Sequence, residues 1–162
     1  AEIRMQVGLA LSRGATGIIY FLYSSGVEEL FDTEGVVDET RVYEGIVDKQ
    51  RMPTESYFAI KQINQELVDL DMELVNFHFH GALSSRNLLD NQFILSIMGI
   101  AEVGLFGDQE NVTHLLIVNR WSHKPQKILL QLRVKGDAGQ PIATPRAVEV
   151  RLAPGGFTLL AL

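Results

Sequence analysis

The chain has 162 residues, enough for one ordinary domain or two small ones, and its 46% hydrophobic and 21% charged residues are typical of a globular protein. A net charge of −6 argues against a nucleic-acid partner, and no apolar run reaches the ~20 residues of a membrane helix, so we expect no membrane partner either. The absence of cysteine excludes disulfides, thiolate nucleophiles and cysteine-ligated zinc.

The first segment predicts a helix followed by a strand. Apolar residues recur at helical spacing over residues 2–13, and Gly14 stands where a helix C-terminal cap is expected. Residues 16–23 contain the continuous apolar run Ile18–Tyr23, which is too short for a buried helix and does not alternate. Such a run is typical of a strand covered on both faces, as in a parallel sheet. A helix, a glycine and a buried strand together predict one step of an α/β fold.

Residues 24–52 are strongly acidic and predict a long loop. Long loops in compact domains are often functional. One interpretation is a solvated acidic surface. The other is a calcium site, although the spacing of the acids does not follow an EF-hand loop. Between Glu28 and Asp48, eight acids are opposed only by Arg41: Glu28, Glu29, Asp32, Glu34, Asp38, Glu39, Glu44 and Asp48.

The second half changes from a helical period to a period of two. Residues 53–71 predict an amphipathic helix that opens with Pro53 and Glu55 in its first turn. From residue 76 to residue 162 we expect an all-β antiparallel sandwich, because short β-like runs are separated by turn signals. The runs are Leu74–Phe79, Phe93–Ile100, Val103–Phe106, Val112–Val118, Ile128–Val134, Ala147–Leu152 and Phe157–Leu162.

Few residues form a motif with chemistry of its own. His78 and His80 would point to the same face of a strand, which suits zinc, but only His114 and His123 remain as further imidazole ligands. Polar residues on a half-exposed strand explain the pair better, so we expect no metal site. The sequence contains no nucleophile elbow, phosphate-binding loop or dinucleotide fingerprint, so it predicts no catalytic residue and no cofactor.

Several short motifs, in order along most of the chain, resemble a known enzyme group. They resemble the last helix–strand step, the segment opening the final helix, and the closing β-sandwich of a clan-A glycoside hydrolase, and the nearest likeness is to the β-galactosidase-like enzymes. The first group is Arg4-Met5-Gln6, Leu9-Ala10-Leu11, Gly14-Ala15-Thr16-Gly17 and Ile19-Tyr20-Phe21. The second is Gly45-Ile46-Val47-Asp48, Arg51-Met52-Pro53-Thr54-Glu55-Ser56-Tyr57 and Ile60-Lys61-Gln62-Ile63-Asn64. The third is Gly104-Leu105-Phe106, Leu116-Ile117-Val118-Asn119-Arg120 and Leu152-Ala153-Pro154-Gly155-Gly156.

The resemblance implies a fold and a site. Residues 1–75 would be the closing segment of a β/α barrel, an α/β fragment made of helix 2–13, strand 16–23, loop 24–52 and helix 53–71. Residues 76–162 would be an accessory β-sandwich. The acid/base and nucleophile glutamates of such enzymes would precede Ala1, so the resemblance assigns no catalytic residue here. Substrate-facing positions would be Tyr23 and Ser24, where an aromatic ring stacks on a sugar; packing inside the barrel is the alternative for Tyr23.

The expected function is therefore the C-terminal fragment of a retaining glycoside hydrolase that acts on β-linked galactosides or related sugars and is inactive as this chain alone. Its expected partners are a carbohydrate substrate, bound through the complete enzyme, and a companion polypeptide or a second copy that covers Ile18–Tyr23. The alternative is a non-catalytic carbohydrate-binding or structural β-sandwich module. A row of exposed aromatic residues on one sheet face would support that alternative, and for Trp121, the one tryptophan, capping the core and meeting a sugar are equal interpretations.

Overall fold

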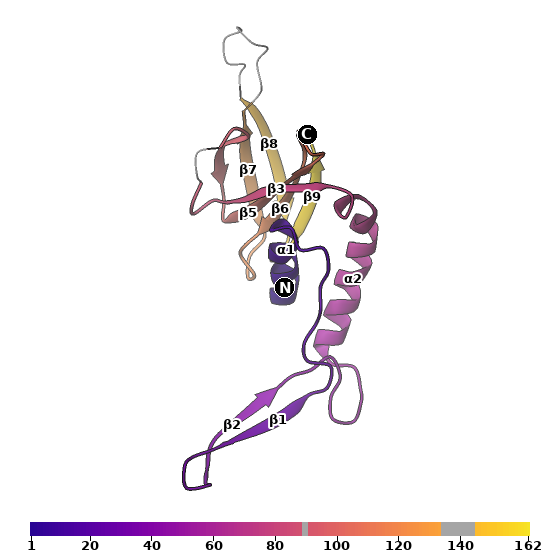
Figure 1. Cartoon of the computed structure of the whole chain (residues 1–162), viewed down its shortest axis with the longest axis vertical. Coiled ribbons are helices and arrows are strands. Elements are labelled where there is room, and N and C mark those ends of the chain that lie inside the picture. Colours follow the sequence, from indigo (N-terminus) through magenta and orange to yellow (C-terminus); the bar gives the residue numbers. More distant parts are fainter. Residues whose placement is uncertain (89–90, 134–144) are drawn as a thin grey trace. The chain divides into compact units, whose positions relative to one another are not determined.

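The computed structural model describes residues 1–88, 91–133 and 145–162. These residues form two compact units, and the ribbon in Figure 1 traces both. One unit combines Ala1–Gly17 with Leu70–Leu162, and the other is Ile18–Asp69. No helix in the described ranges is long and apolar enough to span a membrane.

The first unit contains two antiparallel sheets packed as a sandwich. The four-stranded sheet has the order β3-β5-β6-β9 and the three-stranded sheet the order β4-β7-β8. Four strands make up the larger sheet: β3 (His78–Ser84), β5 (Ala101–Gly107), β6 (Val112–Asn119) and β9 (Phe157–Ala161). The smaller sheet contains β4 (Ile94–Met98), β7 (Gln126–Leu132) and β8 (Arg146–Leu152).

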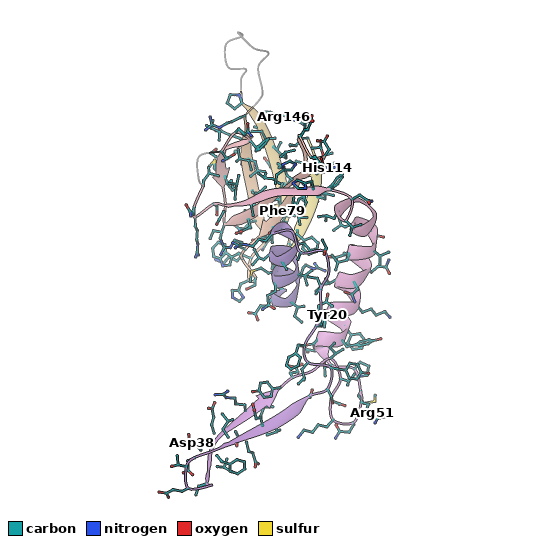
Figure 2. The ribbon with its side chains drawn as sticks, viewed as in Figure 1. Tyr20, Asp38, Arg51, Phe79, His114 and Arg146 are labelled. Carbon is teal, nitrogen blue, oxygen red and sulfur yellow. The ribbon has the colours of Figure 1, made fainter. Side chains whose placement is uncertain are left out.

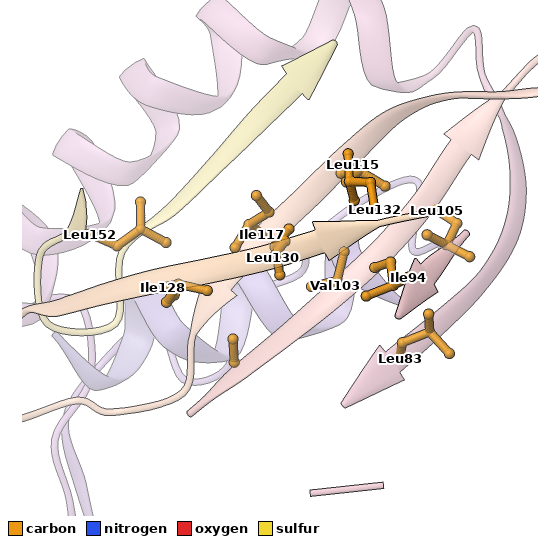
Figure 3. Packing of buried hydrophobic residues seen from close by; sticks show 11 residues of the cluster. Leu83, Ile94, Val103, Leu105, Leu115, Ile117, Ile128, Leu130, Leu132 and Leu152 are labelled. Carbon is orange, nitrogen blue, oxygen red and sulfur yellow. The ribbon is translucent and has the colours of Figure 1, made fainter. Parts of the chain in front are cut away.

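The core lies between these two sheets. Alternate residues of each strand point inward, as the pleat of a strand requires, and Figure 3 shows them meeting from both sides. Fully buried examples are Leu115 and Ile117 on β6 and Ile128 and Leu130 on β7. The complete cluster is Leu83, Ile94, Ala101, Val103, Leu105, Leu115, Ile117, Ile128, Leu130, Leu132 and Leu152.

Helix α1 (Glu2–Ser12) covers the outer face of the larger sheet. It contacts β5 and β6, and it buries Val7 and Leu11. Glycines allow this close approach: a Cβ atom on Gly104 of β5 would lie 2.9 Å from the Cα atom of Ser12, and one on Gly8 would lie 2.8 Å from the ring of Phe157. Because the sandwich core covers one face of β5 and helix α1 the other, every residue of β5 is buried.

The predicted barrel end, helix–strand–helix, is wrong. The described part of the chain has three antiparallel sheets and no parallel strand pairing beyond an isolated bridge. Residues Ile18–Tyr23 form no strand, because a strand covered on both faces needs neighbouring strands, and none of the described strands pairs with this segment. Helix α1 packs on a sheet of the sandwich instead of on a barrel strand.

The first strand predicted for the second half of the chain begins too early. The sequence predicted a strand over Leu74–Phe79, but Leu74 is the last residue of helix α2 (Glu55–Leu74), and the first sandwich strand begins at His78. The helix continues because its apolar stripe extends past the predicted end at residue 71. Val134, the last residue of the predicted run Ile128–Val134, lies outside the described residues.

The second unit contains a two-stranded hairpin and most of α2. Strands β1 (Gly26–Phe31) and β2 (Val37–Tyr43) pair antiparallel where a loop was predicted over residues 24–52. The buried apolar residues of this unit are few among those described: Val47, Ile60 and Ile63. All residues of β2 are exposed. The hairpin therefore has no core of its own, and isolated two-stranded hairpins are marginally stable at best in water.

Candidate functional site

The segment Ile18–Tyr23 is the most unusual surface of the second unit. Its alternate side chains are open to solvent: Ile19 is 96%, Phe21 92% and Tyr23 69% exposed. Within the described part of the chain, Ile18–Phe21 form no backbone hydrogen bond. The segment thus presents both apolar side chains and free backbone donors and acceptors, which is the surface of an unpaired strand edge.

Tyr20 anchors this segment to helix α2. Its hydroxyl donates a hydrogen bond to Oδ1 of Asn64 at 2.9 Å, and its position is labelled in Figure 2. Partial burial raises the pKa of Tyr20 above its usual value, so the phenol remains protonated as the donor at neutral pH. Tyr20 therefore points to α2, while Ile19 and Phe21 on either side of it face solvent.

Residues Leu22–Ser25 are joined by backbone hydrogen bonds to Gly45–Val47 at the base of the hairpin. The Ile46 N–H donates to the Leu22 carbonyl at 3.0 Å and the Val47 N–H to the Tyr23 carbonyl at 2.9 Å. The Ser25 hydroxyl also donates to the Val47 carbonyl at 3.0 Å. A Cβ atom on Gly45 would lie 2.5 Å from the Ser25 nitrogen, so only glycine allows the two segments to approach this closely.

A tight turn follows this junction and leads into helix α2. Oδ1 of Asp48 accepts hydrogen bonds from the N–H groups of Gln50 at 2.9 Å and Met52 at 2.8 Å. The Thr54 hydroxyl lies within hydrogen-bond distance of the carbonyls of Gly45 and Ile46, at 2.8 and 2.9 Å. The residues that carry the glycosidase resemblance in this region thus form a hydrogen-bonded junction that fixes where the hairpin and the helix begin.

The predicted substrate-facing residues lie beside this junction. Tyr23 is largely exposed, and its backbone carbonyl is tied to Val47. Ser24 is exposed and forms an isolated parallel bridge with Val47. Packing inside a barrel, one of the two interpretations of Tyr23, does not occur in this chain, because its ring is open to solvent. Contact with a sugar stays a prediction for both residues.

A groove of about 340 Å³ lies along helix α2 in the same unit. It is lined by apolar side chains of Ile46, Tyr57 and Ile60 and by the polar groups of Lys61 and Asn64. Asn64 is also the residue that holds Tyr20. None of the residues that line the groove is an aspartate or glutamate, so the groove does not offer the carboxylate pair that a glycoside hydrolase uses.

The acidic stretch forms a hairpin whose two faces both carry charged and apolar side chains. On one face, the Tyr43 hydroxyl donates to Oε2 of Glu28, and Arg41 donates to Oε1 of Glu39 at 2.9 Å. The hydrogen bond with Glu28 raises the pKa of Tyr43. On the other face, the exposed pair Val27 and Val42 lies next to the pair Glu29 and Thr40. Figure 2 shows side chains projecting from the hairpin near Asp38.

A local signal could have located this hairpin in the sequence. Oδ1 of Asp32 accepts hydrogen bonds from the N–H groups of Glu34 at 2.9 Å and Val36 at 2.8 Å, and Gly35 adopts φ +79°. Asp followed three residues later by Gly is typical of a turn. The flanking segments do not alternate between apolar and polar residues, so the sequence predicted a loop instead of two strands.

In the first unit, His78 and His80 lie side by side on β3. Their rings contact each other at 5.1 Å between centroids, and Nε2 of His80 lies 2.7 Å from the carbonyl oxygen of Asp108. In the described ranges, no three His, Asp or Glu side chains gather around one point.

Trp121 is exposed to 37%. The ammonium of Lys124 lies 5.0 Å from the centroid of its ring, which occupies one face of the indole with a cation–π contact. Among the large hydrophobic residues exposed on the described part of the sandwich, Trp121 is the one aromatic. A row of stacking rings, which a carbohydrate-binding module would use, is therefore not found on these residues.

Comparison with known protein families, with characterised proteins and with solved structures found no match to this chain.

Proposed function

We propose that this chain is the non-catalytic C-terminal part of a retaining glycoside hydrolase that acts on β-linked galactosides or related sugars. The motif resemblance, which follows the chain in order, suggests the enzyme class. Retaining enzymes need two carboxyl groups about 5–5.5 Å apart, and the resemblance assigns both glutamates to a companion polypeptide. The sandwich would then serve as an accessory structure.

The observation that carries this proposal is the exposure of Ile18–Tyr23. Covering Ile19 and Phe21 would stabilise an assembly by about 1.5–3 kcal/mol for each large side chain fully buried. The free backbone groups of Ile18–Phe21 would gain hydrogen bonds in the same step. The companion polypeptide that bears the glutamates is the partner that this surface fits in our proposal.

The proposal is tested by the coding sequence upstream of this chain and by the joined polypeptide that it encodes. We expect an upstream segment with glutamates after two predicted strands. The joined protein should hydrolyse p-nitrophenyl β-galactoside and release a product with retained anomeric configuration, measured by proton NMR. This chain alone should release no nitrophenol. An unrelated upstream domain, an inactive joined protein or an active isolated chain would contradict the proposal.

Tyr23 provides a sharper version of the same test in the joined protein. Tyr23→Ala should raise KM several-fold, because a ring stacked on the sugar would be lost, while Tyr23→Phe should retain most of the affinity. Phe58→Ala removes another exposed aromatic of the same unit, at 61% exposure, and should leave KM unchanged. Equal KM values for Tyr23→Ala and the unmodified enzyme would exclude Tyr23 from the substrate site.

A further inference from the structure

A second polar pocket lies entirely within the first unit and has no role in the proposed function. Its volume is about 340 Å³ and its lining includes three arginines and one carboxylate: Arg13, Ser84, Arg86, Asn87, Glu102 and Arg120. These residues come from the end of α1, from β3 and the turn after it, from β5, and from the residue that follows β6. Four separate parts of the unit therefore converge on one small space.

The buried carboxylate of Glu102 holds two of the arginines in place. Glu102 is 1% exposed. Its Oε1 accepts hydrogen bonds from Nε and Nη2 of Arg13 at 2.9 and 2.6 Å, and its Oε2 accepts one from Nη1 of Arg120 at 3.2 Å. Nη1 of Arg120 also donates to the Ser84 hydroxyl at 2.9 Å. The guanidinium planes are thus fixed before any ligand arrives, which lowers the entropic cost of binding.

Each arginine keeps donors that these bonds do not use. Nη1 of Arg13 and Nη2 of Arg120 have no acceptor among the described residues, and the Arg86 guanidinium has none at all there. No buried side-chain nitrogen or oxygen of the described residues lacks a partner, so these donors are open to solvent. Their accessibility leaves them available to a ligand that enters the pocket.

The charge of the pocket favours an anion. Three guanidinium groups face one described carboxylate, which leaves an excess of two positive charges. Arginine presents its N–H groups as a planar fork that matches a carboxylate, sulfate or phosphate. The volume lies at the lower end of small-molecule sites, about 300–1,000 Å³, and accommodates more than a bare inorganic ion.

We infer that this pocket binds the oxyanion group of a small organic acid, with Arg86 as the recruiting residue and Arg13 and Arg120 as the preorganised pair. Glu102 acts as the positioning residue, because it touches the arginines and not the ligand. A purely structural network would need Arg13, Glu102 and Arg120 but would give Arg86 nothing to do. The behaviour of Arg86 therefore separates the two explanations.

The test is a titration of the full chain, followed through the arginine Nε–Hε signals in ¹H–¹⁵N NMR spectra at constant ionic strength. The probes are sodium glucuronate, sodium acetate and inorganic phosphate, with glucose as the uncharged control. We expect glucuronate or phosphate to shift the signals of Arg13, Arg86 and Arg120 with saturation, and glucose to shift none. Tighter binding of glucuronate identifies a carboxylate ligand, and tighter binding of phosphate a phosphorylated one.

Arg86→Ala should weaken this binding by about tenfold or more, because it removes charge-assisted hydrogen-bond donors, and it should leave the thermal midpoint of unfolding unchanged. The matched control is Arg151→Ala, which removes an exposed arginine from β8 in the other sheet and should bind like the unmodified chain. The inference is overturned if no anion saturates the shifts of these signals at concentrations on the order of 10–20 mM, the range of weak metabolite binding. It is also overturned if Arg86→Ala binds the anion as tightly as the unmodified chain.

Discussion

Asp108 stabilises the turn between β5 and β6 through its charge. Its Oδ1 accepts hydrogen bonds from the N–H groups of Glu110 at 2.8 Å and Asn111 at 2.7 Å. These backbone donors, Glu110 first and then Asn111, hold the pKa of Asp108 below its usual value. The folded chain therefore binds a proton at this carboxyl less readily than the unfolded chain does.

This pKa shift predicts a pH-dependent contribution to stability. Because the folded pKa is depressed, the contribution is fully present above the unfolded pKa of about 3.9 and is lost as the pH falls through the folded pKa. Asp108→Asn should lower the urea midpoint at pH 7, and the difference from the unmodified chain should shrink below about pH 4. Gln109→Ala changes an uncharged residue of the same turn, so the difference between its urea midpoint and that of the unmodified chain should be the same at every pH. A difference for Asp108→Asn that stays constant from pH 7 to pH 2.5 would contradict the prediction.

His80 shows what alternation misses at a single residue. Alternation places the imidazoles of His78 and His80 on one face, and their ring centroids do lie 5.1 Å apart. The pairing of β3 with β5 shifts register between Phe79 and Gly81, so His80 is the extra residue of a bulge. Its Nε2 lies 2.7 Å from the carbonyl oxygen of Asp108. A bulge depends on the partner strand, so the sequence of β3 alone could not predict this contact with Asp108.

At the scale of elements, the close packing of α1 on the larger sheet depends on two glycines. Gly104 lies in the middle of β5 under the end of the helix, and Gly8 lies on the helix itself. A methyl group on Gly104 would meet the backbone of Ser12, including its Cα atom at 2.9 Å. Backbone atoms cannot turn aside as a flexible side chain can, so the helix would have to move away from the sheet.

Gly104→Ala should therefore destabilise the fold by about 1–3 kcal/mol, the usual cost of adding a methyl group to a closely packed site. Urea unfolding followed by circular dichroism measures the loss. Gly17→Ala is the matched control, because no heavy atom lies within 4 Å of the position of its Cβ, and its effect should stay within about 0.5 kcal/mol. Equal midpoints for the two variants would show that α1 does not pack against β5 as described.

The periodicity of apolar residues predicted the strands of the sandwich better than it predicted the elements in the first third of the chain. Strand β7 alternates buried Ile128, Leu130 and Leu132 with more exposed neighbours, and this pattern is visible in the sequence. Ile18–Tyr23 has an equally clear apolar pattern, but its Ile19, Phe21 and Tyr23 side chains are exposed and no described strand pairs with it. A run of apolar residues indicates that the segment favours burial, but it does not indicate which other element covers it.

Over the whole molecule, the net charge is concentrated in the hairpin. The chain has 14 basic and 20 acidic residues. Residues 26–44 contain seven of the acids and one of the bases, which leaves thirteen of each elsewhere. The sandwich unit and the remainder of the chain are thus nearly neutral, and the composition of the whole chain hides this division. An acidic protein by overall charge can still carry an arginine-lined pocket, because the excess of acids lies in another part of the sequence.

The uneven distribution of buried residues predicts how the chain breaks under a protease. The exposed glutamates of the hairpin, such as Glu28 and Glu39, lie on a two-stranded ribbon without a core, and such regions open at low free-energy cost. A glutamate-specific protease should therefore cut within residues 28–44 first. Helix α1 should keep the resulting N-terminal piece bound, because Val7 and Leu11 are 3% and 8% exposed against the sheet, and each contributes about 1.5–3 kcal/mol when fully buried.

Size-exclusion chromatography after a brief digestion checks this prediction. The nicked chain should elute as one species, and a denaturing gel of that peak should show two pieces. Val7→Asp places a charge in the buried interface of α1, so the N-terminal piece of this variant should separate after the same cut. Release of the piece from the unmodified chain would mean that α1 is held only by its covalent connection. A first cut in the sandwich would mean that the hairpin is more stable than its lack of a core allows.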